Sequence, residues 1–111
     1  MSEKISYLNY THPKIKALIK EIIKTLKENI KQPFKVFLFG SFATGKATYF
    51  SDLDIAIETK EDLENKHLYK IKEELEKIRT LRKIDLVYLN KAPDSLKEVI
   101  NKEGILIYGS W

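Results

Sequence analysis

The stretch that most constrains this chain is an apolar run that ends in a glycine turn and is followed by two closely spaced acids. The run Phe34-Lys35-Val36-Phe37-Leu38-Phe39 leads directly into Gly40-Ser41, which predicts a buried strand that ends in a tight turn. After residues 42–51, the acids of Asp52-Leu53-Asp54 open a second apolar run. The stretch therefore predicts a strand, a turn and a second strand.

The two acids of this stretch point to a metal site. Side chains alternate across a strand, so Asp52 and Asp54 share one face while the apolar residues fill the other. Neighbouring carboxylates repel each other and are costly to bury. A divalent cation would remove that penalty, and Mg²⁺ prefers hard oxygen ligands. We interpret the acids as metal ligands that face a phosphate-binding turn at Gly40-Ser41, although most Gly-Ser pairs are plain turns.

Composition limits the classes of protein to which the chain can belong. Its 111 residues suffice for one modest core, so we expect a single domain over residues 1–111. The chain has no cysteine, which excludes disulfides and thiolate metal sites, and it has no apolar run of membrane-spanning length. We expect a cytoplasmic protein without a membrane partner. The net charge of +4 fits solvated helix faces, with attraction for RNA or a nucleoside triphosphate as the open alternative.

The rest of the chain predicts helices that alternate with further strands. Apolar residues recur at helical spacing in two long segments, and the second begins with the capping-box form Thr59-Lys60-Glu61-Asp62. The order of the elements predicts an α/β (α+β) fold, a small mixed β-sheet with one layer of helices packed on it. The expected helices span residues 11–32, 59–78 and 93–103, with Gly104 as the stop of the third, and the expected strands span 34–39, 53–58, 83–89 and 105–108.

A third acid, Asp85, stands in an otherwise apolar strand. Such an acid is often an edge residue paired with a basic side chain, and balancing its charge is one alternative for Arg82 and Lys83, which directly precede Ile84 and Asp85. With Asp52 and Asp54 in the same sheet, metal ligation becomes the favoured interpretation. Three strand carboxylates that face a Gly-Ser turn suit two-metal transfer of a nucleotidyl group. Asp85 is then the candidate that helps to activate the acceptor, because it would reach only one metal.

The spacing of Gly40-Ser41, Asp52-Leu53-Asp54 and Asp85 resembles the signature of the DNA-polymerase-β-type nucleotidyltransferase superfamily. The likeness is greatest to the minimal nucleotidyltransferases, called MNT, and covers nearly the whole chain. It implies a polymerase-β-like nucleotidyltransferase core in which Asp52, Asp54 and Asp85 are catalytic and hold two Mg²⁺ ions. By the same resemblance, Gly40 and Ser41 bind triphosphate oxygens of ATP.

The loop after the Gly-Ser pair departs from the family pattern. Many members read Gly-Ser-Arg-Ala-Arg-Gly, whereas Phe42 and Thr44 take the places of the two arginines in this chain. Lys46 is then the nearest cation and the candidate for nucleotide binding. The aromatic residues Phe42, Tyr49 and Phe50 either stack on a base or anchor the loop to the core.

The resemblance also implies a partner. Minimal family members are typically paired with a helical HEPN-type toxin, to whose tyrosine they attach AMP, and this chain lacks the Arg-x4-His motif of the toxin half. We therefore expect a Mg-dependent nucleotidyltransferase and antitoxin that transfers AMP from ATP to a hydroxyl. Two alternatives are open: the catalytic subunit of a two-component enzyme whose helical substrate-binding subunit holds a small molecule, and a binding-only antitoxin that acts by occlusion. Nucleic-acid binding ranks last, and an oligomer is left open.

Overall fold

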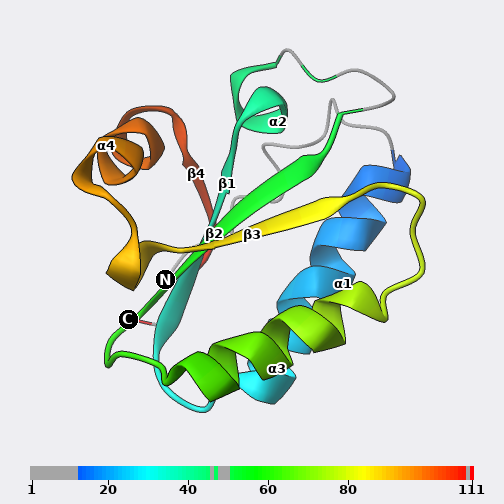
Figure 1. The fold of residues 1–111 in the computed structure, drawn as a ribbon. Coiled ribbons are helices and arrows are strands. Elements are labelled where there is room, and N and C mark those ends of the chain that lie inside the picture. Colours follow the sequence, from blue (N-terminus) through cyan, green and yellow to red (C-terminus); the bar gives the residue numbers. More distant parts are fainter. Residues whose placement is uncertain (1–12, 46, 48–50, 110) are drawn as a thin grey trace.

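Four strands form one mixed sheet in the computed structural model of the chain, which describes residues 13–45, 47, 51–109 and 111 (Figure 1). The elements are, in chain order, α1 (Pro13–Asn29), β1 (Phe34–Phe39), α2 (Ser41–Thr44), β2 (Leu53–Thr59), α3 (Asn65–Glu76), β3 (Ile84–Tyr88), the 3₁₀ helix η2 (Leu89–Lys91), α4 (Asp94–Glu103) and β4 (Ile105–Gly109). The strand order is β3-β2-β1-β4. β1 runs antiparallel to both β2 and β4, and β2 runs parallel to β3. The predicted mixed sheet is confirmed.

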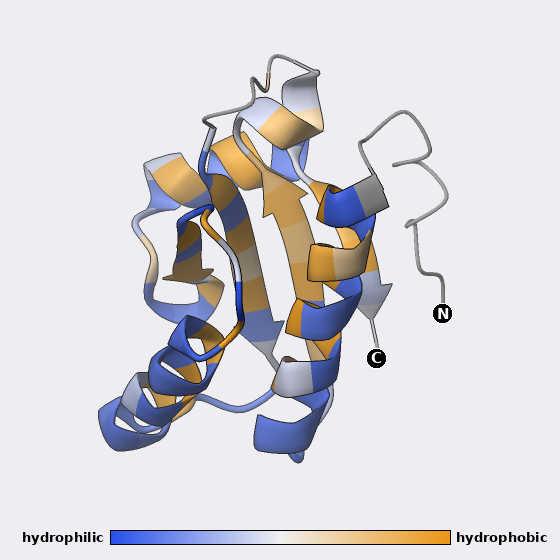
Figure 2. Ribbon diagram, turned by 90° about the vertical axis from the view of Figure 1, so that its right-hand side faces the viewer, coloured by the Kyte–Doolittle hydropathy of each residue, from blue (hydrophilic) through white to orange (hydrophobic). Residues whose placement is uncertain are grey.

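Helices cover both faces of this sheet. α1 and α3 pack together on one face, where alternate apolar residues of the strands meet the apolar sides of the helices (Figures 1 and 2). α4 lies over the other face, where Ile100 joins Ala56 and Leu89 in a smaller buried cluster. The expectation of one helical layer is therefore wrong, because Phe37 and Val87 make part of the second face apolar as well. The completely shielded side chains of the larger core are Ile19, Ile22, Leu26, Val36, Leu38, Leu53, Ile55, Ile57, Ile71 and Ile107.

Most element boundaries lie within a few residues of the predicted ones. β1 has the predicted bounds, and β2 extends one residue further, to Thr59. α4 ends before Gly104, as predicted. The predicted start of the first helix at Thr11-His12 lies outside the described residues. No helix in the described part of the chain combines the length and the apolar character needed to cross a bilayer.

The helix after β2 begins later than the capping-box pattern predicts. α3 starts at Asn65, and Glu64 at its N-cap position makes no capping hydrogen bond through its side chain. The Thr59 hydroxyl instead donates to the carbonyl of Glu61 at 2.7 Å. It also lies 2.7 Å from the buried Tyr88 hydroxyl, which therefore donates to it. The side chain that was expected to cap a helix thus belongs to a buried network that links β2 to β3.

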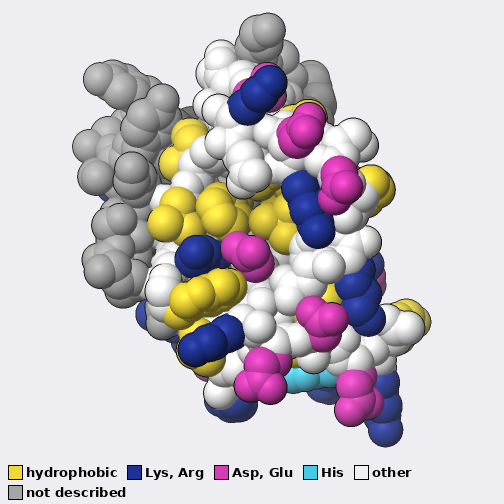
Figure 3. All heavy atoms as spheres, turned by 90° about the vertical axis from the view of Figure 1, so that its left-hand side faces the viewer, with side chains coloured by type: hydrophobic (Ala, Val, Ile, Leu, Met, Phe, Trp, Pro, Cys, Tyr) yellow, Lys and Arg dark blue, Asp and Glu magenta, His cyan; other side chains and the backbone are white. Residues whose placement is uncertain are grey.

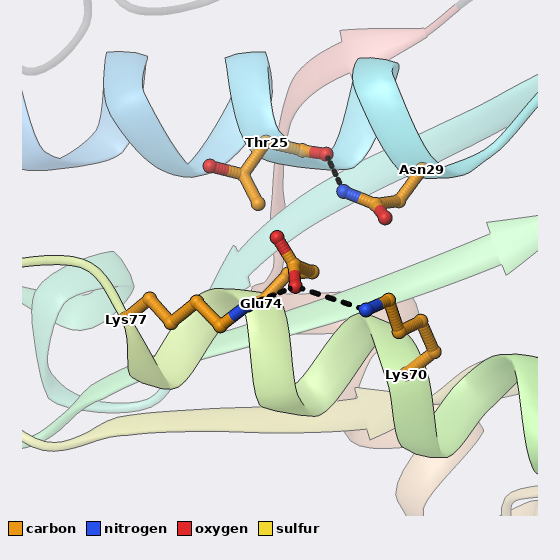
Figure 4. A network of polar contacts seen from close by, with 5 residues as sticks. All are labelled: Thr25, Asn29, Lys70, Glu74 and Lys77. Carbon is orange, nitrogen blue, oxygen red and sulfur yellow. Dashed lines mark hydrogen bonds and ion pairs between the residues drawn. The ribbon is translucent and has the colours of Figure 1, made fainter.

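Polar contacts occupy the surfaces of α1 and α3 outside the core (Figure 4). The Glu74 carboxylate lies 2.7 Å from the Lys77 ammonium and 3.3 Å from that of Lys70. Hydrogen bonds from Lys77 and Lys70 lower the pKa of Glu74. On α1, the Asn29 side chain donates to the Thr25 carbonyl at 2.8 Å. Exposed ion pairs of this kind contribute little to stability, so the fold depends mainly on the core.

Tyr88→Phe should lower the free energy of unfolding by about 1–2 kcal/mol. The Leu63 backbone N–H donates to the Tyr88 hydroxyl at 2.8 Å in a buried setting, and the substitution would leave it without that acceptor. Chemical denaturation followed by circular dichroism measures the change. Tyr69→Phe is the matched control, because Tyr69 is 67% exposed. Equal midpoints for Tyr88→Phe and the unsubstituted protein would show that the network does not stabilise the fold.

Candidate functional site

The turn after β1 brings its backbone against an acid of β2. Gly40 adopts φ 71° and ψ −151°, a conformation that residues with a side chain rarely adopt. Its carbonyl accepts hydrogen bonds from the backbone N–H groups of Ala43 and Thr44 in the short helix α2. A Cβ atom at position 40 would overlap Oδ2 of Asp54. Glycine is therefore needed for two reasons, the backbone conformation and the room for the Asp54 carboxylate.

β2 and β3 place two acids side by side. Asp54 of β2 lies opposite Asp85 in the parallel pairing of β2 with β3. On its other side, Asp54 lies opposite Phe39 in the antiparallel pairing of β2 with β1. Asp54 and Asp85 are half-buried, whereas Asp52 precedes β2 and is exposed. Burial raises the pKa of Asp54, and the negative charges of Asp85 and Asp52 raise it further, against the opposing charge of Lys83. The three acids therefore lie within electrostatic reach of one another.

The three carboxylates form an open arrangement. Within the described residues, no group of three or more acidic, histidine or cysteine side chains is gathered closely enough to hold a metal ion by itself. Mg²⁺, however, usually takes one or two carboxylates and completes its shell with water and substrate phosphates. Asp54 and Asp85 on adjacent strands fit that requirement, with Asp52 two residues away along the chain. A cation at this point would relieve the repulsion that raises the pKa of Asp54.

Asp85 has the basic partner that one interpretation of its sequence position predicts, and its role as a metal ligand stays a prediction. Its Oδ1 atom lies 3.7 Å from Nζ of Lys83, so this acid of an edge strand has a basic partner. The Lys83 side chain is 69% exposed and that of Asp85 is 47% exposed, so solvent weakens the pair. The pair therefore holds the Asp85 carboxylate only weakly.

Arg82 contacts the loop around the site, a role that its sequence position did not indicate. Its guanidinium group donates to the backbone carbonyl of Ser51 and lies over the ring of Phe42, 5.0 Å from the centroid. Phe42 also packs against the core, which supports the interpretation that it anchors the loop. The sequence carries no signal for the contact, because Ser51 and Arg82 meet only through the alignment of β2 with β3.

The structure describes only some of the other residues that were predicted to bind the nucleotide. Ser41 follows Gly40, begins α2 and is half-buried. Lys46, Tyr49 and Phe50 lie outside the described residues, so their roles stay predictions. The turn thus lies against the Asp54 carboxylate, where Phe39 at the end of β1 pairs with Asp54.

The acids lie on the face of the sheet that carries α4. Seen from the α4 side, the surface of the protein shows apolar side chains gathered between basic and acidic ones (Figure 3). Phe37 and Phe39, which share the face of Asp54 by alternation, are only partly buried. An incoming molecule would therefore meet both apolar contact area and charge beside the acids.

The sequence matches the family model described as polymerase beta, nucleotidyltransferase, over residues 20–110. A relative from Haemophilus influenzae, named "probable protein adenylyltransferase MntA", is 30% identical over 86 residues, which are 78% of this chain and 75% of the relative. The protein adenylyltransferase MntA of Shewanella oneidensis is 30% identical over 90 residues, which are 81% of this chain and 64% of the relative.

Solved structures share the fold. A crystal structure of a toxin-antitoxin with AMP-PNP has a TM-score of 0.70 at 30% identity and covers 82% of this chain and 73% of that chain. A structure of a tri-AMPylated Shewanella oneidensis HEPN toxin in complex with MNT antitoxin has a TM-score of 0.67 at 26% identity, over 85% of this chain and 71% of that chain. The polymerase-β-like core and the resemblance to the MNT family are confirmed.

Gly40→Ala should destabilise the protein more than Gly45→Ala does. Both glycines have positive φ, so each substitution adds backbone strain of about 1 kcal/mol. Only the Cβ at position 40 would also overlap Asp54, whereas no atom lies within 4 Å of a Cβ at position 45. Thermal unfolding of the two variants measures the difference. Equal losses would show that the Asp54 carboxylate moves away without cost.

Asp54→Asn should stabilise the metal-free protein by about 0.5 kcal/mol at pH 7, because it removes the repulsion from Asp85 and Asp52. The fold raises the pKa of Asp54 above 3.8, so protonation of Asp54 favours folding. This contribution is complete below the unfolded-state pKa and is lost as the pH rises through the folded-state pKa. The gain from asparagine should therefore vanish in acid, where both states of Asp54 are protonated.

Denaturation in EDTA across this pH range measures the effect of Asp54→Asn. Glu58→Gln is the control, because it removes a carboxylate from the same strand at a position opposite Lys35 and should give no gain. A loss of stability in Asp54→Asn at neutral pH would contradict the repulsion.

Proposed function

Because this chain belongs to the polymerase-β nucleotidyltransferase family, we propose that it transfers AMP from ATP to a hydroxyl group of a partner protein. The observation that carries the proposal is the placement of Asp54 against Gly40 and opposite Asp85. One carboxylate thereby lies against the turn that would receive the triphosphate, and a second lies opposite the first on the adjacent strand. The relatives named protein adenylyltransferase support AMP as the transferred group and a protein as its acceptor.

The proposed partner is a HEPN-type toxin, with this chain as the antitoxin and a tyrosine hydroxyl as the acceptor. The similarity to an MNT antitoxin in complex with a tri-AMPylated HEPN toxin supports that pairing. The partly buried apolar residues Phe37 and Phe39 share the face of Asp54, so they offer contact area for a protein surface next to the acids. A phenolic hydroxyl reaching this face would arrive next to Asp85.

The proposed reaction forms a bond between the acceptor oxygen and the α-phosphorus of ATP, breaks the bond to the β-phosphate oxygen and releases pyrophosphate. Backbone N–H groups at Gly40 and the hydroxyl of Ser41 bind phosphate oxygens, with Lys46 as a further cation. Asp52 and Asp54 hold Mg²⁺, and Asp85 helps to take the proton from the acceptor hydroxyl. When bound, Mg²⁺ supplies charge neutralisation on the triphosphate and lowers the pKa of the acceptor hydroxyl.

The test is intact-mass spectrometry of the toxin after incubation with this chain, ATP and Mg²⁺. We expect a mass gain of one or more AMP groups. Asp52→Asn and Asp54→Asn should slow the transfer by about a hundred- to a thousandfold, because the ions would lose a carboxylate ligand. EDTA should abolish the gain, and Glu58→Gln, on the same strand, should leave the rate unchanged.

Three results would contradict the proposal. Transfer at the normal rate by Asp54→Asn would exclude the acids as its catalytic groups. A tight complex with the toxin that forms without any mass gain, and that survives loss of all three aspartates, would indicate inhibition by occlusion. A mass gain on a small molecule in place of the toxin would identify a two-component enzyme.

A further inference from the structure

The proposed nucleotide site is assembled from two segments, the turn at residues 40–45 and the segment 51–54. The strand pairing joins the two segments only in part. Asp54 pairs with Phe39, which directly precedes the turn, whereas Leu53 pairs with Ile84 of β3, which belongs to neither segment. Asp52 lies beyond these pairs, before the first residue of β2, and is exposed. The position of the Asp52 carboxylate relative to the turn therefore depends on contacts outside the ladder.

Arg82 supplies contacts to both segments. Its guanidinium donates to the carbonyl of Ser51, the residue directly before Asp52. The same group lies over the ring of Phe42 in α2, directly after the Gly-Ser pair, at 5.0 Å from the ring centroid. Arg82 is itself half-buried, so the contacts are partly shielded from solvent. One side chain thus spans the gap between the turn and the acids.

A second contact holds Asp52 from its other side. The backbone N–H of Leu53 donates to the carbonyl of Lys83 at 2.9 Å. Asp52 therefore lies between two residues that are bonded to consecutive residues of the segment before β3, Ser51 to Arg82 and Leu53 to Lys83. Fixing the backbone on both sides limits the directions in which the Asp52 carboxylate can point.

The chemistry of arginine suits this double contact. A planar guanidinium can place its face on an aromatic ring and still donate hydrogen bonds from its edge. A lysine ammonium is a compact point charge on a flexible stem and has no planar edge for the second contact. The two interactions on Arg82 should therefore depend on each other.

We propose that Arg82 is a positioning residue that holds Asp52 and the Gly40-Ser41 turn in the relative placement that binds the nucleotide. It acts through Ser51 and Phe42 and does not itself touch the phosphates. The proposal rests on the proposed function to the extent that the bound ligand is ATP with Mg²⁺. The positioning itself is a property of the ligand-free protein and can be measured there.

The first measurement is hydrogen exchange of the nucleotide-free protein. In Arg82→Ala, amides of residues 41–45 and 51–54 should exchange about tenfold faster, since the link between the two segments is lost. Amides in α4, which lies outside both segments, should keep their rates. Arg79→Ala is the control, because it removes an exposed arginine of the same loop region and should change neither segment.

The second measurement is the affinity for AMP-PNP with Mg²⁺ by calorimetry. Arg82→Ala should raise Kd about tenfold, the scale of one lost charge-assisted hydrogen bond, and Phe42→Leu should raise it about threefold. On this proposal Phe42 affects nucleotide binding through its contact with Arg82, so the double variant should bind no more weakly than Arg82→Ala alone. Arg82→Lys should recover less than half of the loss.

The outcomes separate this inference from the proposed function. If the two single effects multiply, or if Arg82→Lys binds as tightly as the unsubstituted protein, Arg82 acts on the phosphates by charge and the positioning role is wrong. Unchanged exchange in Arg82→Ala would also overturn it. If the unsubstituted protein binds no AMP-PNP, the proposed function fails, and hydrogen exchange still decides whether Arg82 links the segments.

Discussion

The register of β1 against β2 is the constraint on which both the core and the site depend. It pairs Phe39 with Asp54, so the acid lies beside Gly40 on the face away from α1 and α3. Because side chains alternate, a slip of one residue would turn Asp54 toward the main core and expose Ile55 on the other face. Burying an unpaired carboxylate is costly enough to exclude that arrangement. The alternation that forms the core thus also presents the acids.

The negative charges of the acids lower the stability of the fold that positions them. The pKa of Asp54 is raised by burial and by two neighbouring negative charges, which means that its ionised form is disfavoured at this place. Such local strain is tolerated where the surrounding structure is well determined, and functional sites often contain it. Here the main core under β1 and β2 and the buried network at Thr59 and Tyr88 hold the strands on which the acids stand.

Patterns within a few residues were enough to predict much of this structure. The apolar run 34–39 and the alternation after Asp52 predicted β1 and β2, and the spacing of glycine and acids pointed to the site. Interactions between distant residues were not predictable in this way. Thr59 could cap a helix or join a buried network, and only the position of Tyr88 decides between them. Arg82 could have paired with Asp85, but the alignment of β2 with β3 brings Ser51 and Phe42 to its guanidinium.

The strand order also has a consequence for biosynthesis. β1 lies inside the finished sheet, between β2 and β4, yet β4 is made after the other three described strands. Until β4 pairs with it, β1 is an edge strand whose sequence FKVFLF has a single charge, at Lys35. Exposed apolar edges of this kind can pair with other chains and aggregate. A chain that stops before residue 105 would therefore leave this edge of β1 exposed, and β4 covers it once residues 105–109 have been made.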